Sequence, residues 1–259
     1  MNRKTVYTLL AGLCLAMAVV TFCMEWEIPL YQGVLALLIF LGVFSFAVQV
    51  FFLRRATVFQ DKMTQAISAF MESCDTQTYF RTMNDLMREE KNAPYRNVLK
   101  INISMGYSYY GDFQKANALL EEVVAVPMAP ITQAIVWNNM ASNDFCMGEI
   151  SKGCAIMTEQ EDLLNQYRKE PSCGSGIAQT FAMWHFALGE TEKGKAALAE
   201  AMETAEYEAD RDLCRLMEAE QEILAGNTEQ AKTVLESLFK TPIMAYAAEK
   251  RDRLYQLLE

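Results

Sequence analysis

Histidine is almost absent from this chain of 259 residues, in which His185 is the only one. The seven cysteines include no C-x-x-C pair and no Cys/His cluster has zinc spacing. Neither a G-x-S-x-G motif nor a glycine-rich phosphate loop occurs. We interpret His185, between Trp184 and Phe186, as a packed side chain; an enzyme would gain support only if it lined a pocket beside carboxylates. The sequence therefore predicts no catalysis, no cofactor and no metal.

Basic residues are also scarce, since 23 Lys and Arg stand against 33 Asp and Glu, for a net charge of −10. Residues 1–53 are neutral overall, because Arg3 and Lys4 balance Glu25 and Glu27, so the excess negative charge lies on residues 54–259. Such a surface repels phosphate backbones, and we expect no nucleic-acid partner. The odd, scattered set of cysteines is atypical of a disulfide framework and suits a reducing compartment.

Charge is missing altogether from two long apolar runs, Thr5 to Met24 and Gly33 to Leu53. Runs of 20 and 21 residues are long enough to cross the hydrocarbon core of a bilayer, about 30 Å, as helices. Only Glu25 to Gln32 separates them, which is enough for a hairpin turn. The lack of ionisable groups inside either run argues against a channel or carrier. We therefore predict a two-span transmembrane anchor over residues 1–55.

The basic residues that flank these runs predict the orientation of the anchor. Arg3 and Lys4 precede the first run, Arg54 and Arg55 follow the second, and the connecting loop has none. By the positive-inside rule both termini face the cytoplasm, and we expect an integral protein of a bacterial plasma membrane. One alternative is a cleaved signal peptide, which the length of the first run and the second run behind it disfavour. The other is an inverted topology, with the rest of the chain outside the cytoplasm.

The stretch after the anchor contains neither glycine nor proline until Pro94. Apolar residues continue at helical spacing, so we expect the second span to run on as one helix to about Glu72. Asp75 is a predicted N-cap for a helix from Thr76 to about Lys91. Residues 56–96 thus read as a helical connection and a degenerate first helical hairpin, with Asp75 and the cysteine before it in place of a glycine–acid pair.

A short pattern then recurs four times: a glycine, a polar helix start, and a small residue five positions after the glycine. The glycines are Gly111, Gly148, Gly189 and Gly226, and the small residues are Ala116, Gly153, Gly194 and Ala231. The intervals between glycines are 37, 41 and 37 residues, which is the range of helical-hairpin arrays. In units of about 34 residues, the repeats begin near Asn97, Ala134, Ser175 and Asp212 and cover residues 97–242.

These columns resemble the tetratricopeptide repeat family. The match consists of small residues at unit positions 8 and 20, the glycine at 15 and a large apolar residue at 24, together with Trp137 and Tyr107. The chain departs from the family at position 4, which is Lys100, Ala178 or Arg215 in the other units, and at position 32, which is never proline. The resemblance implies an all-α fold, in which the N-terminal two-helix transmembrane hairpin precedes a right-handed α-solenoid of about four to five helix pairs and a capping helix.

Two segments stand apart from the repeat units. The stretch from Lys169 to Gly176 is rich in Gly, Pro and Ser and is either a bend in the array or a long loop; we favour a loop that accounts for the longer interval. Residues 243–259 are the predicted capping helix, because Ile243 to Leu258 has apolar residues on one side and charged residues on the other.

The resemblance also implies a concave groove lined by the first helix of each pair. At the family's groove positions this chain carries amides, methionines and aromatics, which can bond a peptide backbone and pack its side chains. These residues are Asn102, Met105, Tyr109, Asn138, Asn139, Ser142, Phe145, Gln179, Met183 and Phe186. Some family members clamp a C-terminal carboxylate with groove Lys and Arg, and the first three units have neither at these positions.

We therefore predict a membrane-anchored adaptor or scaffold that recruits a partner to the cytoplasmic face through the groove. Its expected partners are an unidentified protein or peptide and the lipid bilayer, with no small-molecule substrate. The alternative is a structural or assembly subunit of a larger membrane complex for envelope, secretion or transport, in which the transmembrane hairpin makes the main contacts.

Overall fold

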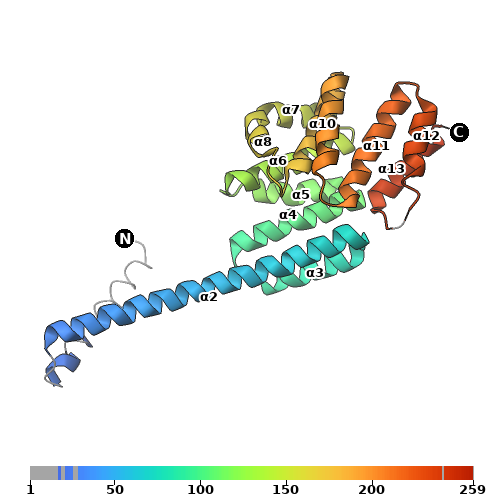
Figure 1. Ribbon diagram of the computed structural model, residues 1–259. Coiled ribbons are helices and arrows are strands. Elements are labelled where there is room, and N and C mark those ends of the chain that lie inside the picture. Colours follow the sequence, from blue (N-terminus) through green and yellow to red (C-terminus); the bar gives the residue numbers. More distant parts are fainter. Residues whose placement is uncertain (1–16, 19–20, 26–28, 241, 259) are drawn as a thin grey trace. The chain divides into compact units, whose positions relative to one another are not determined.

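The computed structural model describes residues 17–18, 21–25, 29–240 and 242–258, and these residues form helices and no strand (Figure 1). The predicted all-α class is confirmed. The helices are α2 (Leu30–Ser73), α3 (Thr76–Glu89), α4 (Ala93–Tyr110), α5 (Phe113–Val124), α6 (Pro130–Cys146), α7 (Ile150–Glu159), α8 (Glu161–Tyr167), α9 (Gly174–Ala187), α10 (Thr191–Thr204), α11 (Glu208–Leu224), α12 (Thr228–Glu236) and α13 (Ala245–Gln256). The chain divides into two compact units, Met1–Lys62 and Met63–Glu259.

The apolar part of α2 dominates the first unit. Its large side chains are exposed, with Phe46 at 68% and Leu53 at 66% of their full accessibility. In the part of the chain that the structure describes, the one helix long and apolar enough to cross a membrane is Tyr31–Ser73, judged by length and composition alone. Most of the predicted first span, 5–24, lies outside the described residues, although 17–18 and 21–25 are helical. Of the predicted turn, 25–32, residues 26–28 lie outside them, and α2 already begins at Leu30.

The connection between the apolar run and the repeats follows the predicted pattern closely. Helix α2 is continuous to Ser73, and α3 begins at Thr76 with Asp75 as its N-cap. The Asp75 carboxylate accepts hydrogen bonds from the backbone amides of Gln77 and Thr78, both at 3.1 Å. Between the two helices Cys74 has φ of 56°, the left-handed conformation otherwise typical of glycine.

The four repeat glycines end α4, α6, α9 and α11 and turn the chain into the next helix. Their φ angles are 98°, 79°, 75° and 80° for Gly111, Gly148, Gly189 and Gly226. Glycine adopts this region without the steric penalty that a Cβ atom would bring. The prediction of a turn glycine at each of these positions is confirmed, and Cys74 shares their conformation.

Helices on the two sides of each glycine pack against one another, as α4 with α5, α6 with α7, α9 with α10 and α11 with α12. The small residue of each copy lies at this contact. Ala116 and Ala231 are fully buried, and a Cβ atom added at Gly153 or Gly194 would lie 2.8 or 2.4 Å from a phenylalanine ring. Small side chains are therefore required where the two helices of a pair come closest.

The segment between α7 and α9 contains a helix ahead of the predicted loop, and residues 169–173 of that loop are not helical. A short helix, α8, follows α7, and its Leu164 is fully buried in an apolar cluster of the second unit. Helix α9 begins at Gly174, so the irregular part is confined to residues 168–173. The longer interval between glycines is thus taken up largely by an extra helix, which burial of one leucine holds in place.

The last helix does more than cover the end of the repeats. Helix α13 packs on α11 and α12 and also on α4, the first helix of the first pair after α3. The ring of Tyr246 lies edge-on to that of Phe113, with 4.9 Å between centroids, and Ala247 and Leu254 are buried. Helix α13 therefore connects the last helix pair of the second unit, α11–α12, with the first helix of the α4–α5 pair.

All six cysteines in the described part of the chain are free.

Candidate functional site

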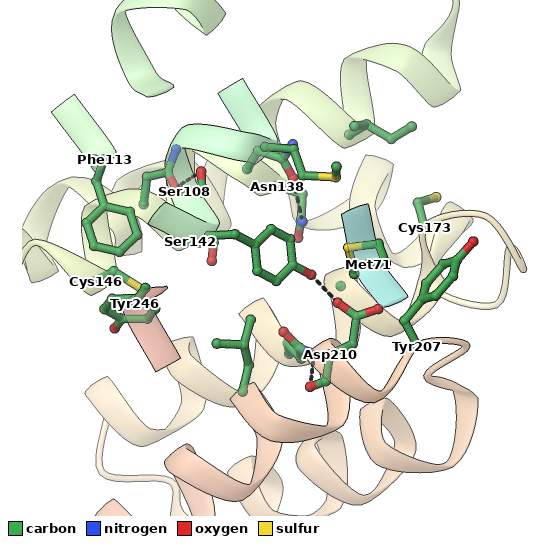
Figure 2. Close-up of a pocket in the computed structure, with 18 of the residues that line it drawn as sticks. Met71, Ser108, Phe113, Asn138, Ser142, Cys146, Cys173, Tyr207, Asp210 and Tyr246 are labelled. Atoms are coloured by element: carbon green, nitrogen blue, oxygen red, sulfur yellow. Dashed lines mark hydrogen bonds between the residues drawn. The ribbon is translucent and has the colours of Figure 1, made fainter. Parts of the chain in front are cut away.

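A cavity of about 330 Å³ lies inside the second unit. Its walls come from the first helices of the pairs, α4, α6, α9 and α11, together with α13 and the end of α2. Figure 2 shows Asp210 in the middle of this space, Phe113, Cys146 and Tyr246 on one side, and Met71, Cys173 and Tyr207 on the other. The second helices of the pairs contribute little to the wall, because they lie on the far side of the first helices.

Most of the predicted groove residues meet at this cavity. Eight of the ten line it: Asn102, Met105, Tyr109, Asn138, Asn139, Ser142, Gln179 and Met183. They come from α4, α6 and α9, which are consecutive first helices. The structure therefore brings together residues that are up to 81 positions apart in the sequence, from Asn102 to Met183.

Phe145 and Phe186 were placed in the groove by the sequence analysis, and this assignment is wrong. Their rings pack within their own pairs, against the faces of Gly153 and Gly194, and neither residue lines the cavity. Each phenylalanine ring occupies the space that a Cβ atom of the facing glycine would need, and this space lies within the helix pair. The sequence held a signal for this, because phenylalanine at unit position 12 occurs only in the two units with glycine at position 20.

The repeat pattern does not predict several of the residues that line the cavity, and Asp210 is the most important of them. It lies two residues before the last unit begins, so no groove position of the repeat pattern includes it. Tyr246 and Lys250 come from α13, whose predicted role was only to cap the array. Met71 comes from the end of α2. Nothing in the repeat pattern indicates that these elements return to the first pair.

The amides of the cavity differ in how far their hydrogen bonds are satisfied. Gln179 Nε2 donates to the backbone carbonyl of Asp210 at 3.1 Å, and Asn102 Nδ2 donates to the carbonyl of Val98 at 2.9 Å. Asn138 is 6% exposed, and its Nδ2 donates to Asn139 Oδ1 at 3.3 Å. The Oδ1 atom of Asn138 is buried and has no hydrogen-bond partner in the described structure. It is an acceptor that a ligand could use.

A hydrogen bond from Tyr109 to Asp210 crosses the cavity and joins α4 to α11 (Figure 2). The Tyr109 hydroxyl donates and the carboxylate accepts. Burial, and then the neighbouring charge of Asp210, raises the pKa of Tyr109 well above its ordinary value. Burial also raises the pKa of Asp210, although the bond from Tyr109 and the charge of Arg211 act in the opposite direction. Tyr109 is therefore a permanent donor at neutral pH.

On the α13 side, Cys146 and Tyr246 form a hydrogen-bonded pair, and burial raises the pKa of both groups. The thiol is consequently protonated at neutral pH and is a poor nucleophile. His185 lies elsewhere: its Nδ1 is 2.8 Å from Glu190 Oε2, and neither residue lines the cavity. Across the described residues no group of three His, Cys, Asp or Glu side chains is arranged to hold a metal ion. What the cavity offers is hydrogen bonding and apolar contact.

A scan of the chain against protein-family models finds no match. A search of curated proteins also finds no match to the chain.

Proposed function

We propose that this protein is a membrane-anchored adaptor that holds a segment of a partner protein in the cavity and performs no chemistry of its own. The observation that carries the proposal is the buried, unpartnered Oδ1 atom of Asn138 at a cavity lined by further amides and by methionines. A buried acceptor without a partner is costly, and a peptide amide would satisfy it. Methionines beside it adapt to the shape of an incoming side chain.

The anchor is the two-span hairpin expected from the sequence, with both termini and the second unit in the cytoplasm. The exposed apolar side chains of α2 support this proposal, because a contiguous apolar surface of this length is unfavourable in water and favourable in lipid. The basic residues at the ends of the two runs support the orientation.

The second unit is proposed to be a solenoid similar to the tetratricopeptide repeats. Positive φ at four regularly spaced glycines, small residues at the contact within each pair, and cavity walls made from the first helices all support it. The contact of α13 with α4 is a departure from an open array, and it narrows the expected groove to a cavity.

The test is capture of a partner from solubilised native membranes by the full-length protein and by a cavity variant with Asn138→Ala and Met183→Ala. A control variant, Asn165→Ala, changes an exposed amide on α8 that lies outside the cavity. We expect a partner that the wild type and the control capture and the cavity variant loses, while circular dichroism shows equal helix content. A partner that the cavity variant captures equally well would contradict the proposal.

A second candidate function is a structural subunit of a larger membrane complex for envelope, secretion or transport, which makes its main contacts through the transmembrane helices. The aromatic side chains of α2 favour it: Phe40 and Phe44 stack with centroids 6.2 Å apart on an exposed apolar face. Replacing both by leucine keeps the helix lipid-soluble and alters only the shape of this face. Loss of the partner in this variant, together with its retention in the cavity variant, would favour the subunit.

A further inference from the structure

The cavity contains one charge that the protein itself does not neutralise. Two charged residues line it, Asp210 and Lys250. Lys250 Nζ lies 2.7 Å from the carboxylate of Glu220, so its charge is compensated. Asp210 forms no ion pair with any described residue, and its carboxylate accepts a hydrogen bond from the neutral hydroxyl of Tyr109. Asp210 is therefore the charged residue of the cavity wall that lacks an ion-pair partner.

A second acceptor lies at the same cavity, on the opposite set of helices. Asn138 Oδ1 on α6 is buried without a partner, and Nδ2 of the same amide donates to Asn139 Oδ1 at 3.3 Å. Only one other buried side-chain polar atom in the described structure lacks a partner, Trp184 Nε1, and it is not at the cavity. The cavity thus presents one buried acceptor without a partner, Asn138 Oδ1, and one carboxylate without an ion pair, Asp210.

The rest of the wall favours an alkyl chain. Met105, Met183, Leu213 and Met217 supply apolar surface from three first helices, α4, α9 and α11. A closed apolar cavity of about 150 Å³ holds a benzene molecule, and the cavity here measures about 330 Å³. This is room for one long side chain and its neighbouring backbone.

We propose that the cavity binds a lysine or arginine side chain of the partner segment, with the cationic head on Asp210 and Asn138 and the alkyl stem against the methionines. This inference rests on the proposed adaptor function and names the residue type that the adaptor recognises. A cation at Asp210 gives the partly buried carboxylate the ion-pair partner that it lacks, and N–H groups of the same cation satisfy Asn138 Oδ1. Burial raises the pKa of the Asp210 carboxyl, which supports the proposed cation site, because a nearby positive charge would favour the ionised carboxylate.

The experiment uses the full-length protein in detergent micelles and capped alanine pentapeptides whose central residue is lysine, arginine, norleucine or glutamate, with binding measured by calorimetry. We expect the lysine and arginine peptides to bind about tenfold or more tightly than the norleucine peptide, the effect of one charge-assisted hydrogen-bonded pair. Asp210→Asn should remove this preference, so that the lysine, arginine and norleucine peptides bind with similar affinity. The control Asp162→Asn removes the same charge from an exposed position on α8 and should change nothing.

We expect both variants to fold, because asparagine keeps the shape of Asp210 and can still accept the bond from Tyr109; melting curves of both variants test this. Equal binding of the lysine and norleucine peptides would overturn the inference and leave the adaptor intact, as would a preference for glutamate. If free butylamine binds as tightly as the lysine peptide, the ligand is a small amine and not a side chain of a partner protein. This result would also overturn the inference. If no peptide binds and the cavity variant still captures the native partner, the adaptor proposal fails together with the inference.

Discussion

At the scale of single residues, Asp210 has two roles: it accepts a hydrogen bond from Tyr109, and it is the proposed binding site for a cation. Its carboxylate receives the hydroxyl of Tyr109 and so ties α11 to α4, but it does so in a poorly solvated place without a counter-charge. A group of this kind lowers stability when it is ionised and is retained where a ligand uses it. Its titration therefore reports on both roles.

The first prediction at this scale concerns pH. Burial raises the pKa of Asp210 in the folded state above its ordinary value of 3.8, so the folded state binds the proton more tightly than the unfolded state. Stability contributed by this group is then present below about pH 4 and lost as pH rises through the raised pKa. Asp210→Asn cannot titrate. We expect the melting temperature of the variant, relative to wild type, to increase as pH rises from about 4 and then level off.

The measurement is thermal unfolding of the full-length protein in detergent at a series of pH values, with Asp162→Asn as the control that should show no such trend. The side chains that shift the pKa of Asp210 are Tyr109, Arg211 and Glu206, and all three are unchanged in the variant. A difference between variant and wild type that stays constant with pH would show that Asp210 titrates normally.

At the scale of elements, the helix pair is the unit that repeats, and the contact within each pair depends on the size of one residue. In the α9–α10 pair, Gly194 leaves room for the ring of Phe186, and a Cβ atom at Gly194 would lie 2.4 Å from two of its carbons. In the α4–α5 pair an alanine, Ala116, occupies the same place. The contact within the pair is thus filled by a glycine and a phenylalanine ring in α9–α10, and by an alanine in α4–α5.

We expect Gly194→Ala to destabilise the protein by about 1–3 kcal/mol, because overpacking outweighs the better helix propensity of alanine. In a Phe186→Leu background the same change should cost less, since the smaller side chain can move. Gly176→Ala is the matched control: it also lies in a helix, and its Cβ atom would meet Asn138 Nδ2 at 3.8 Å, an ordinary contact. Denaturant unfolding of the four proteins of this double-mutant cycle, and of the control, measures the coupling. Equal costs in both backgrounds would show that Phe186 does not cause the crowding.

Local features of these elements could be predicted from the sequence, and contacts between them could not. The cap at Asp75 and the four turn glycines follow from φ and from hydrogen bonds within a few residues. Helix α8 was missed because it has seven residues, too few for a clear helical period, and is held by the burial of Leu164. Phe145 and Phe186 were misplaced because the repeat position alone does not say whether a ring faces the cavity or its own pair.

At the scale of the whole molecule, the orientation in the membrane can be tested with two introduced cysteines. Under the proposed topology, Gln32→Cys lies on the outer side of the membrane and Ala155→Cys on the cytoplasmic side; both positions are exposed. A membrane-impermeant maleimide should label the first in intact cells and the second only after permeabilisation, with wild type as the background. The opposite pattern would establish the inverted topology, and labelling of both in intact cells would contradict a two-span anchor.

The sequence by itself determined the all-α class, the long apolar run, the turn glycines and eight of the residues that line the cavity. Each of these depends on patterns within one helix or one turn, where composition and periodicity decide the outcome. The tertiary structure alone decided that α13 returns to α4 and that Asp210 meets Tyr109, 101 residues away. Such contacts depend on the angles at which successive pairs stack, and small differences at each interface add up along the chain. This accumulation closes the expected groove into a cavity and places an acidic group at its centre.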